Sequence, residues 1–335
     1  MSSSCYPAAH LADLAARILV AHNTSAENAA CVADALVAAQ IDGHQGHGLA
    51  RMAAYSAQAA CGKVDGHATP ILTEASPAAV RIDAGHGFAF PAMRLAIDDL
   101  SDRAGRMGIA SAAIFRSHHS GAAGHHVEAL ARRGMIALLF GNAPQAIAPW
   151  GGIKPLFGTN PIAFAAPREA ADPLVIDLSL SKVARGKVML ASKAGEAIPE
   201  GWALDKDGNP TTDADAALAG TMIPIGDAKG AALVLMVEVL AAALTGANFS
   251  YQASSLFTAD GPPPGLGHCL IAINPGPLSG GSFTTRIEQL MGAMLEQEGA
   301  RLPGTRRLDQ RAAAQAEGVS VSDSLYAELQ RLAAH

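Results

Sequence analysis

The stretch IASAAIFRSHHSGAAG, residues 109–124, decides the fold of this chain. It begins with the apolar run Ile109 to Phe115, which is typical of a buried strand, and it leads into a predicted helix at Gly124 to Arg133. Other short β-rich runs lie along the middle of the chain, with a further helix at Pro91 to Ala104, so we predict an α/β fold. The predicted strands are 71–73, 79–82, 109–115, 136–140, 162–165, 174–176 and 270–273.

The two ends of the chain have the pattern of amphipathic helices. Helical ends around an α/β centre suggest that both termini meet in one helical subdomain, made of residues 1–68 and 284–335. Residues 69–283 then form the α/β part, with an exposed, polar, turn-rich excursion at about 195–219. The predicted terminal helices are 7–20, 25–41, 49–60, 284–298 and 308–332.

Composition excludes several classes of protein. Charged residues make up 16% of the 335 residues and the net charge is −6, which argues against a disordered chain and against binding of nucleic acid through phosphate neutralisation. The longest apolar stretch, 231–244, is too short to span a membrane and contains Glu238. The four cysteines form no CxxC pair and the start lacks a signal-peptide pattern, so we expect a cytoplasmic protein without a membrane role.

A glycine-rich break at residues 42–51, with the sequence DGHQGHGLAR, contains the first candidate site. If Gly48 opens the next helix, Arg51 lies one turn beyond His47, and both side chains can face one ligand. An arginine fork and an imidazole donor suit a small carboxylate with an adjacent carbonyl group. The alternative is that His47 caps a helix and Arg51 is a surface cation.

The second candidate site follows the 109–115 strand, at a place where α/β proteins commonly bind ligands. His118 and His119 lie there, and a histidine can act as a general acid near neutral pH. A zinc site is the competing use, through His44 and His47 or through His119 and His125, and it would indicate a metal-dependent hydrolase or lyase. The spacing matches no zinc motif and no cysteine supports it, so we predict no metal.

Nucleotide-binding motifs of the common kinds are absent from the sequence. No GxGxxG follows a strand, which argues against an ordinary Rossmann enzyme. Residues 224–230, PIGDAKG, instead lead into a long apolar helix, where free backbone amides and Lys229 could hold a pyrophosphate. The alternative is a plain helix start with Asp227 as its N-cap. A late basic turn at 301–307 could meet a phosphate or face solvent.

Taken together, these segments resemble the malate/L-lactate dehydrogenase family. This non-Rossmann group includes sulfolactate dehydrogenases, ureidoglycolate dehydrogenase, 2,3-diketogulonate reductase and the Δ1-piperideine-2-carboxylate/Δ1-pyrroline-2-carboxylate reductases. The resemblance runs in order from about residue 10 to 330. The stretches that carry it are Asp42 to Arg51, Ser117-His118-His119, Ala148 to Gly152, Pro155 to Pro161, Gly226 to Gly230, Thr245 to Asn248 and Arg301 to Gly304.

The resemblance implies a homodimeric NAD(P)-dependent oxidoreductase, with a non-Rossmann cofactor-binding sheet beside the helical subdomain. The reaction would move a hydride between the nicotinamide of NAD or NADP and the carbon next to a carboxylate. The substrate would be a 2-hydroxy or 2-oxo acid such as malate, lactate or sulfolactate, or a cyclic 2-imino acid. His119 would donate the proton, and His47, Arg51 and Asn142 would hold the substrate. The implied cofactor-binding residues are Gly124, Thr159, Asn160, Asp177, Leu178, Ser179, Lys229, Gly230 and Arg307.

The chain departs from the family pattern at two positions. Ser120 stands where the family usually has phenylalanine, which changes the size or polarity of the pocket wall. Asp227 stands where glycine is usual, and its charge argues against a 2′-phosphate beside it. Lys187 matches the hydroxy-acid enzymes, whereas residues 244–250 look closer to the imine-reducing and sulfolactate branches. The sequence therefore leaves open both the substrate and the choice between NAD and NADP.

Overall fold

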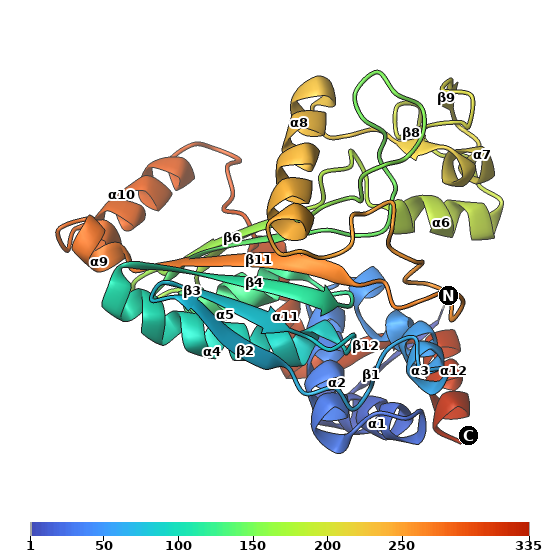
Figure 1. Cartoon of the computed structure of the whole chain (residues 1–335), viewed down its shortest axis with the longest axis horizontal. Coiled ribbons are helices and arrows are strands. Elements are labelled where there is room, and N and C mark those ends of the chain that lie inside the picture. The colour runs from blue at the N-terminus through green and yellow to red at the C-terminus, as the bar shows by residue number, and fades with distance from the viewer. Residues whose placement is uncertain (1, 335) are drawn as a thin grey trace.

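The computed structural model describes residues 2–334, and within them a mixed sheet of seven strands forms the centre of the molecule (Figure 1). Its strand order is β2-β3-β4-β11-β5-β6-β7. β3 and β4 run parallel, and every other neighbouring pair in this sheet is antiparallel. The predicted α/β class is confirmed. The strands are β2 (Ile71–Ser76), β3 (Ala79–Asp83), β4 (Ile109–Ser117), β5 (Ile136–Gly141), β6 (Ile162–Ala166), β7 (Leu174–Leu178) and β11 (Leu266–Ile273).

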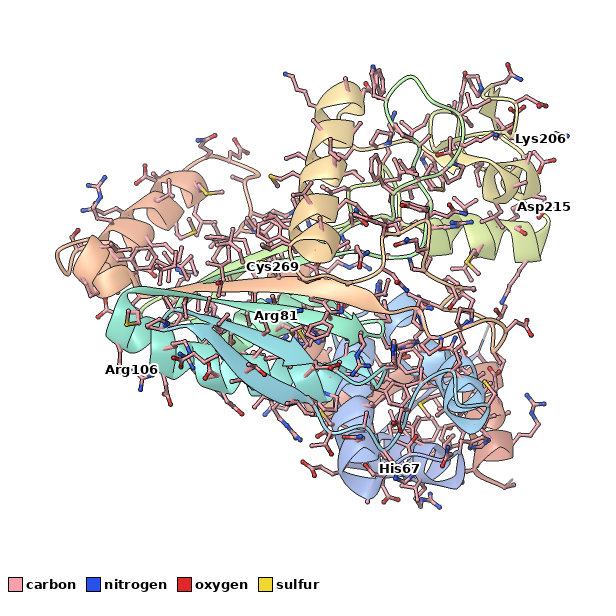
Figure 2. All side chains as sticks on the ribbon, viewed as in Figure 1. His67, Arg81, Arg106, Lys206, Asp215 and Cys269 are labelled. Atoms are coloured by element: carbon pink, nitrogen blue, oxygen red, sulfur yellow. The ribbon has the colours of Figure 1, made fainter. Side chains whose placement is uncertain are left out.

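Helices cover both faces of this sheet. One face packs against α4 (Ala89–Met107) and α5 (Ala123–Ala131), and their cluster includes Ile114 and Leu139. The other face packs against α8 (Asp227–Glu238), which continues as a π-helical turn over Val239–Ala243. Figure 2 shows Cys269 of β11 near the base of α8. Because side chains alternate along a strand, the two faces of β11 serve two separate cores.

Segments from both ends of the chain form a helical unit beside the sheet. They share one apolar cluster, to which α1 contributes Leu11 and β12 contributes Val321. β1 and β12 pair antiparallel, which joins the two ends directly. The segment 308–332 is therefore not one helix, because the strand β12 interrupts it and buries Val319 and Val321. Residues 1 and 335 lie outside the described part. The elements are β1 (Ser3–Tyr6), α1 (Ala8–Ala21), α2 (Ala26–Ile41), α3 (Met52–Ala60), α11 (Thr305–Glu317), β12 (Val319–Ser322) and α12 (Asp323–Ala333).

The segment 284–298 lies elsewhere than predicted. After α9 (Pro275–Leu278), α10 (Phe283–Leu295) packs Ile287 and Met291 against Ala166 at the end of β6. Figure 1 shows α10 at the opposite end of the molecule from α1 and α12. Its amphipathic pattern is real, but the apolar surface that it covers belongs to the sheet.

The excursion is a small folded lobe rather than a solvent-exposed loop. It has its own three-stranded sheet, and Ile198, Ala203 and Ala217 are buried in the same cluster as Val234 of α8. Lys206 and Asp215 mark its outer surface (Figure 2). Among residues 2–334, no helix combines the length and the apolarity that crossing a bilayer requires. The lobe comprises α6 (Arg185–Ala194), β8 (Ala203–Leu204), β9 (Pro210–Thr211), α7 (Ala214–Ala219) and β10 (Thr221–Met222).

Candidate active site

The end of β4 meets the loop before α3 at a group of basic side chains. His47 ends the first of two single 3₁₀ turns, and Arg51 ends the second. His119, just beyond β4, stacks on His47 with ring centroids 5.3 Å apart and an interplanar angle of 24°. Gly48 separates the two turns, and a Cβ atom there would lie 2.7 Å from Gln40 Oε1, so glycine lets the loop approach α2. The structure thus brings together the three residues predicted to act on the substrate.

Arg51 carries a positive charge that the protein does not fully satisfy. Its Nε donates to Gly46 O at 2.7 Å, and the Phe257 ring centroid lies 4.4 Å from Cζ. Nη1 is buried and has no hydrogen-bond partner within residues 2–334. Burial lowers the pKa of Arg51 from its ordinary value, but an arginine keeps its proton at any working pH. A buried N–H without a partner is costly, and a carboxylate is the group that fits it best.

Tyr55 fixes the ring of His119, and sequence reasoning missed it. Tyr55 O and His119 Nδ1 lie 2.6 Å apart. Burial raises the pKa of Tyr55 far above its usual value of 10, so the hydroxyl stays neutral. Its buried O–H has no other hydrogen-bond acceptor within residues 2–334, so it donates a hydrogen bond to Nδ1 of the neutral imidazole. His119 then carries its hydrogen on Nε2. One signal could have revealed Tyr55, because it lies four residues after Arg51 and so faces the same side of a helix.

Both stacked histidines are neutral in the free protein. Burial, and then the charge of Arg51, hold the pKa of His119 well below 6.5. The same causes, in the same order, lower the pKa of His47 to about 4. Burial is the larger cause and the charge of Arg51 adds to it, so an anion bound at Arg51 would raise both pKa values without removing the effect of burial.

The adjacent His118 has a different environment. It is fully buried, and its Nε2–H donates to Gln58 Oε1 at 2.8 Å. Its backbone carbonyl accepts a hydrogen bond of 3.1 Å from His268 Nε2. Burial, followed by Arg51 and Lys63, lowers the pKa of His118 to about 3. His118 is thus held in the core, while His119 faces His47.

The histidines proposed as alternative zinc ligands have other partners. His125 Nε2 lies 2.8 Å from Asp42 Oδ2, and the rings of His44 and His125 are 6.4 Å apart. In the part of the chain that the structure describes, no three His, Cys, Asp or Glu side chains are grouped as metal ligands. The geometry offers nothing in favour of the hydrolase or lyase alternative.

Asn142, which is predicted to hold the substrate, directly follows β5. It is buried, its Nδ2 donates to Asn248 O at 2.8 Å, and its Oδ1 accepts from Gly267 N at 2.9 Å. Both ends of the side chain hold neighbouring backbone and brace the start of β11. A substrate contact from Asn142 stays a prediction.

The predicted cofactor residues converge through two backbone hydrogen bonds of Leu180. Its N–H donates to Thr159 O and its carbonyl accepts from Ile225 N, each at 2.8 Å. These bonds place the end of β7, with Asp177, Leu178 and Ser179, beside the start of α8, where Lys229 and Gly230 lie. Asp177 Oδ2 also accepts the Gly124 amide at 2.7 Å, which adds the first turn of α5 to the group.

The start of α8 fits a bound phosphate. Gly226, with φ of 63°, is the N-cap, so Asp227 is the first helical residue rather than the cap. A methyl group on Gly230 would overlap the Ile225 carbonyl oxygen, so glycine lets this turn close at the positive end of the helix dipole. Lys229 is exposed and supplies a cation. Arg307 is nearly buried, and its Nε makes no hydrogen bond within residues 2–334 but lies 3.6 Å from Asp42 Oδ2 as an ion pair. These groups fit the phosphates of a dinucleotide.

Asn160 is the exception among the cofactor residues. It is completely buried, and its Nδ2 donates to Glu238 Oε2 at 2.7 Å. The same oxygen accepts the Ser250 hydroxyl at 2.6 Å. The side chain of Asn160 is therefore part of an internal network, and its contact with a cofactor stays a prediction.

This chain matches the sequence model of malate/L-lactate dehydrogenases over residues 6–330. It is 58% identical over 275 residues to the (2R)-3-sulfolactate dehydrogenase (NADP(+)) of Chromohalobacter salexigens, covering 82% of each chain. It is 41% identical to the Δ1-pyrroline-2-carboxylate/Δ1-piperideine-2-carboxylate reductase of Pseudomonas syringae pv. tomato, covering 98% of this chain and 96% of the relative.

Solved structures show the same similarity. The crystal structure of Δ1-piperideine-2-carboxylate reductase from Pseudomonas syringae pv. tomato superposes with a TM-score of 0.93 at 40% identity, covering 98% of this chain and 99% of the other. The sulfolactate dehydrogenase of Methanocaldococcus jannaschii superposes with a TM-score of 0.89 at 28% identity, covering 98% and 96%.

Proposed function

We propose a substrate class and residue roles on one premise: this chain belongs to the malate/L-lactate dehydrogenase family. It is an NAD(P)-dependent oxidoreductase that transfers a hydride between nicotinamide and the carbon next to a carboxylate. The bound nicotinamide supplies or accepts the hydride, and the protein supplies binding, orientation and the proton.

The substrate that we propose is a small 2-hydroxy acid of the 3-sulfolactate type, with NADP as the cofactor. The 58% identity to an NADP-dependent sulfolactate dehydrogenase supports this choice. Reduction of a cyclic 2-imino acid is the second candidate, favoured by a reductase that is similar over nearly the whole chain. Both substrates carry the carboxylate next to the reacting carbon that the site requires.

One observation carries the proposal: Arg51 presents a buried, unpartnered Nη1 beside the stacked rings of His47 and His119. Arg51 binds the substrate carboxylate through its fork, and His47 orients the acceptor oxygen or nitrogen. A carboxylate bound there offsets the charge of Arg51, so the pKa of His119 rises when the substrate binds. His119 then delivers its proton from Nε2 as the hydride arrives, and it takes a proton back in the reverse oxidation.

We assign the cofactor to the place where the end of β7 meets the starts of α5 and α8. Lys229 and the backbone of the glycine-bounded turn at the start of α8 hold the pyrophosphate, and the Arg307 guanidinium, which is only partly neutralised by Asp42 at 3.6 Å, attracts a phosphate. The residues that complete this assignment are Gly124, Thr159, Asp177, Leu178 and Ser179. A cofactor that binds there at 100 times its Kd raises the unfolding free energy by about 2.7 kcal/mol, which a thermal melt with NADPH or NADH detects.

We also propose that the enzyme works in the cytoplasm as a homodimer. All four cysteines are free thiols, which suits a reducing compartment. Leu233, Met236, Val239 and Leu244 leave α8 and the turn after it with an exposed apolar face, and a second subunit would cover it. Light scattering after size exclusion measures the mass, and a monomer for both wild type and Leu233→Asp would contradict the proposal.

The function is tested with 3-sulfopyruvate, oxaloacetate, pyruvate and Δ1-piperideine-2-carboxylate, each with NADPH and with NADH, followed at 340 nm. We expect the highest kcat/KM with 3-sulfopyruvate and NADPH. A higher value with the cyclic imine selects the second candidate, and no turnover of any of them rejects the proposed class. Arg51→Lys keeps the charge but loses the fork, so its kcat/KM must fall while NADPH affinity stays unchanged.

A further inference from the structure

A long loop without regular structure lies beside the candidate site. Residues 246–265 connect the π-helical turn after α8 to β11 and include Phe257, whose ring lies against the Arg51 guanidinium. Structureless loops of this length are uncommon in compact domains and are usually functional. Phe257 is 45% exposed, so burial alone does not fix its position and other contacts of the loop must do so.

Lys63 provides an unusual anchor for this loop. Its side chain is only 3% exposed, yet it has no carboxylate partner among the ion pairs of residues 2–334. Its Nζ instead donates to three backbone carbonyls of a single turn, Ser255 O at 2.7 Å, Thr258 O at 3.0 Å and Asp260 O at 2.6 Å. All three ammonium hydrogens are used, so a buried charge is tolerated here only because this turn surrounds it.

Gln58 connects the same turn to the histidines. It is fully buried, and its Nε2 donates to Thr258 O at 2.9 Å. Its Oε1 accepts from His118 Nε2 at 2.8 Å. The end of α3 is thus joined on one side to the 255–260 turn and on the other to the residue before His119.

We propose that Lys63 is a positioning residue for substrate binding: its ammonium group clasps the 255–260 turn and thereby holds Phe257 against Arg51. Phe257 covers one face of the guanidinium, and Gly46 O occupies its Nε edge. The buried Nη1 of Arg51, which has no hydrogen-bond partner within residues 2–334, is then left to bind a carboxylate. Contact with an aromatic ring stabilises the position of a desolvated guanidinium. The energy of such a contact corresponds to about a 2- to 30-fold change in affinity for the substrate.

Three variants test this chain of contacts, in the cofactor-bound enzyme and with its best substrate from the panel above. Lys63→Met keeps the length and removes all three hydrogen bonds, and Lys63→Gln keeps two donors. Phe257→Leu removes the ring alone. We expect KM to rise about 2- to 30-fold in Lys63→Met and in Phe257→Leu, and less in Lys63→Gln, while kcat and the Kd for NADPH change little. Lys206→Met is the matched control, since Lys206 is exposed on the outer edge of the small lobe (Figure 2), and its KM should equal that of the wild type.

The double variant Lys63→Met/Phe257→Leu decides whether Lys63 acts through Phe257. If it does, the KM of the double variant is no higher than that of the worse single variant. If Lys63→Met does not fold, the same cycle is run with Lys63→Gln. The inference is overturned if either Phe257→Leu or the Lys63 variant has the KM of the wild type. It is also overturned if the fold-increase in KM of the double variant equals the product of the fold-increases of the two single variants.

The inference rests on the proposed carboxylate contact of Arg51, and the two can fail separately. An unchanged kcat/KM in Arg51→Lys rejects the proposed function itself. A large fall in Arg51→Lys with wild-type KM in the Lys63 and Phe257 variants rejects only the role of Lys63.

Discussion

Replacing Tyr55 by Phe removes a single hydroxyl group from the centre of the site. Tyr55 is fully buried, and its oxygen lies 2.6 Å from His119 Nδ1. Leaving a buried acceptor without its donor costs about 1–3 kcal/mol, so the unfolding free energy should fall by that amount. The hydroxyl also selects the tautomer that carries hydrogen on Nε2. If that selection is required in the transition state, the same energy corresponds to a fall of about 5- to 150-fold in kcat.

The chain offers a matched control for Tyr55→Phe. Tyr326 also places its hydroxyl against a histidine, 2.9 Å from His10 Nε2, but that pair is exposed and far along the helical unit. Tyr326→Phe should leave kcat unchanged and alter the unfolding free energy by less than about 0.5 kcal/mol. The assay is the rate of substrate reduction at saturating NADPH, followed at 340 nm, with urea unfolding of each variant. Wild-type kcat in Tyr55→Phe would refute the assigned role, whatever its stability.

Three further predictions follow from the same geometry. His119→Gln should slow reduction by about 10²- to 10⁴-fold with NADPH affinity intact, whereas His118→Gln should mainly lower the melting temperature; the reverse outcome would transfer the acid to His118. Burial raises the pKa of Asp42, but hydrogen bonds from His125 and Arg311 outweigh it and lower this pKa from 3.8 to about 2. They therefore stabilise the fold by about 2 kcal/mol above pH 4, and this contribution is lost as the pH falls from 4 to 2. The difference in unfolding free energy between wild type and Asp42→Asn, measured by urea unfolding, should shrink over that range. Gly230→Ala should raise the Kd for NADPH at least about tenfold, because the new methyl group displaces the Ile225 carbonyl; an unchanged Kd by fluorescence titration would place the phosphates elsewhere.

Local patterns in the sequence identified the strands of the main sheet but not their arrangement. The run Ile109 to Phe115 identifies β4, since its residues alternate between buried and less buried positions. The position of β11 between β4 and β5 depends on pairing between residues 127–164 positions apart in the sequence, for which no local pattern exists. The same limit applies to α10, whose amphipathic face fits either a helical bundle or the end of a sheet.

The candidate site divides in the same way. His47 and Arg51 could be proposed because a glycine-rich break and their spacing mark them, whereas the choice of His119 over the adjacent His118 came from the family resemblance. Asn142 and Asn160 have the same polar, strand-end position, yet both are internal braces, because Asn248 and Glu238 come from distant segments. Lys63 was missed for the converse reason: its partners are backbone carbonyls of a loop nearly two hundred residues away, and carbonyl groups leave no trace in a sequence.

The electrostatics of the site link recognition of a carboxylate to supply of the proton. Arg51 is a permanent cation, and its charge is one reason why both His47 and His119 stay neutral when no ligand is bound. An anion at Arg51 offsets that repulsion and raises the pKa of His119, so a bound carboxylate favours the protonated acid. A neutral carbonyl compound of the same shape lacks this effect, and it would meet an unprotonated His119 as well as an unpaired guanidinium. Discrimination against such compounds therefore affects kcat as well as KM, because binding energy at the carboxylate is used to make the proton donor.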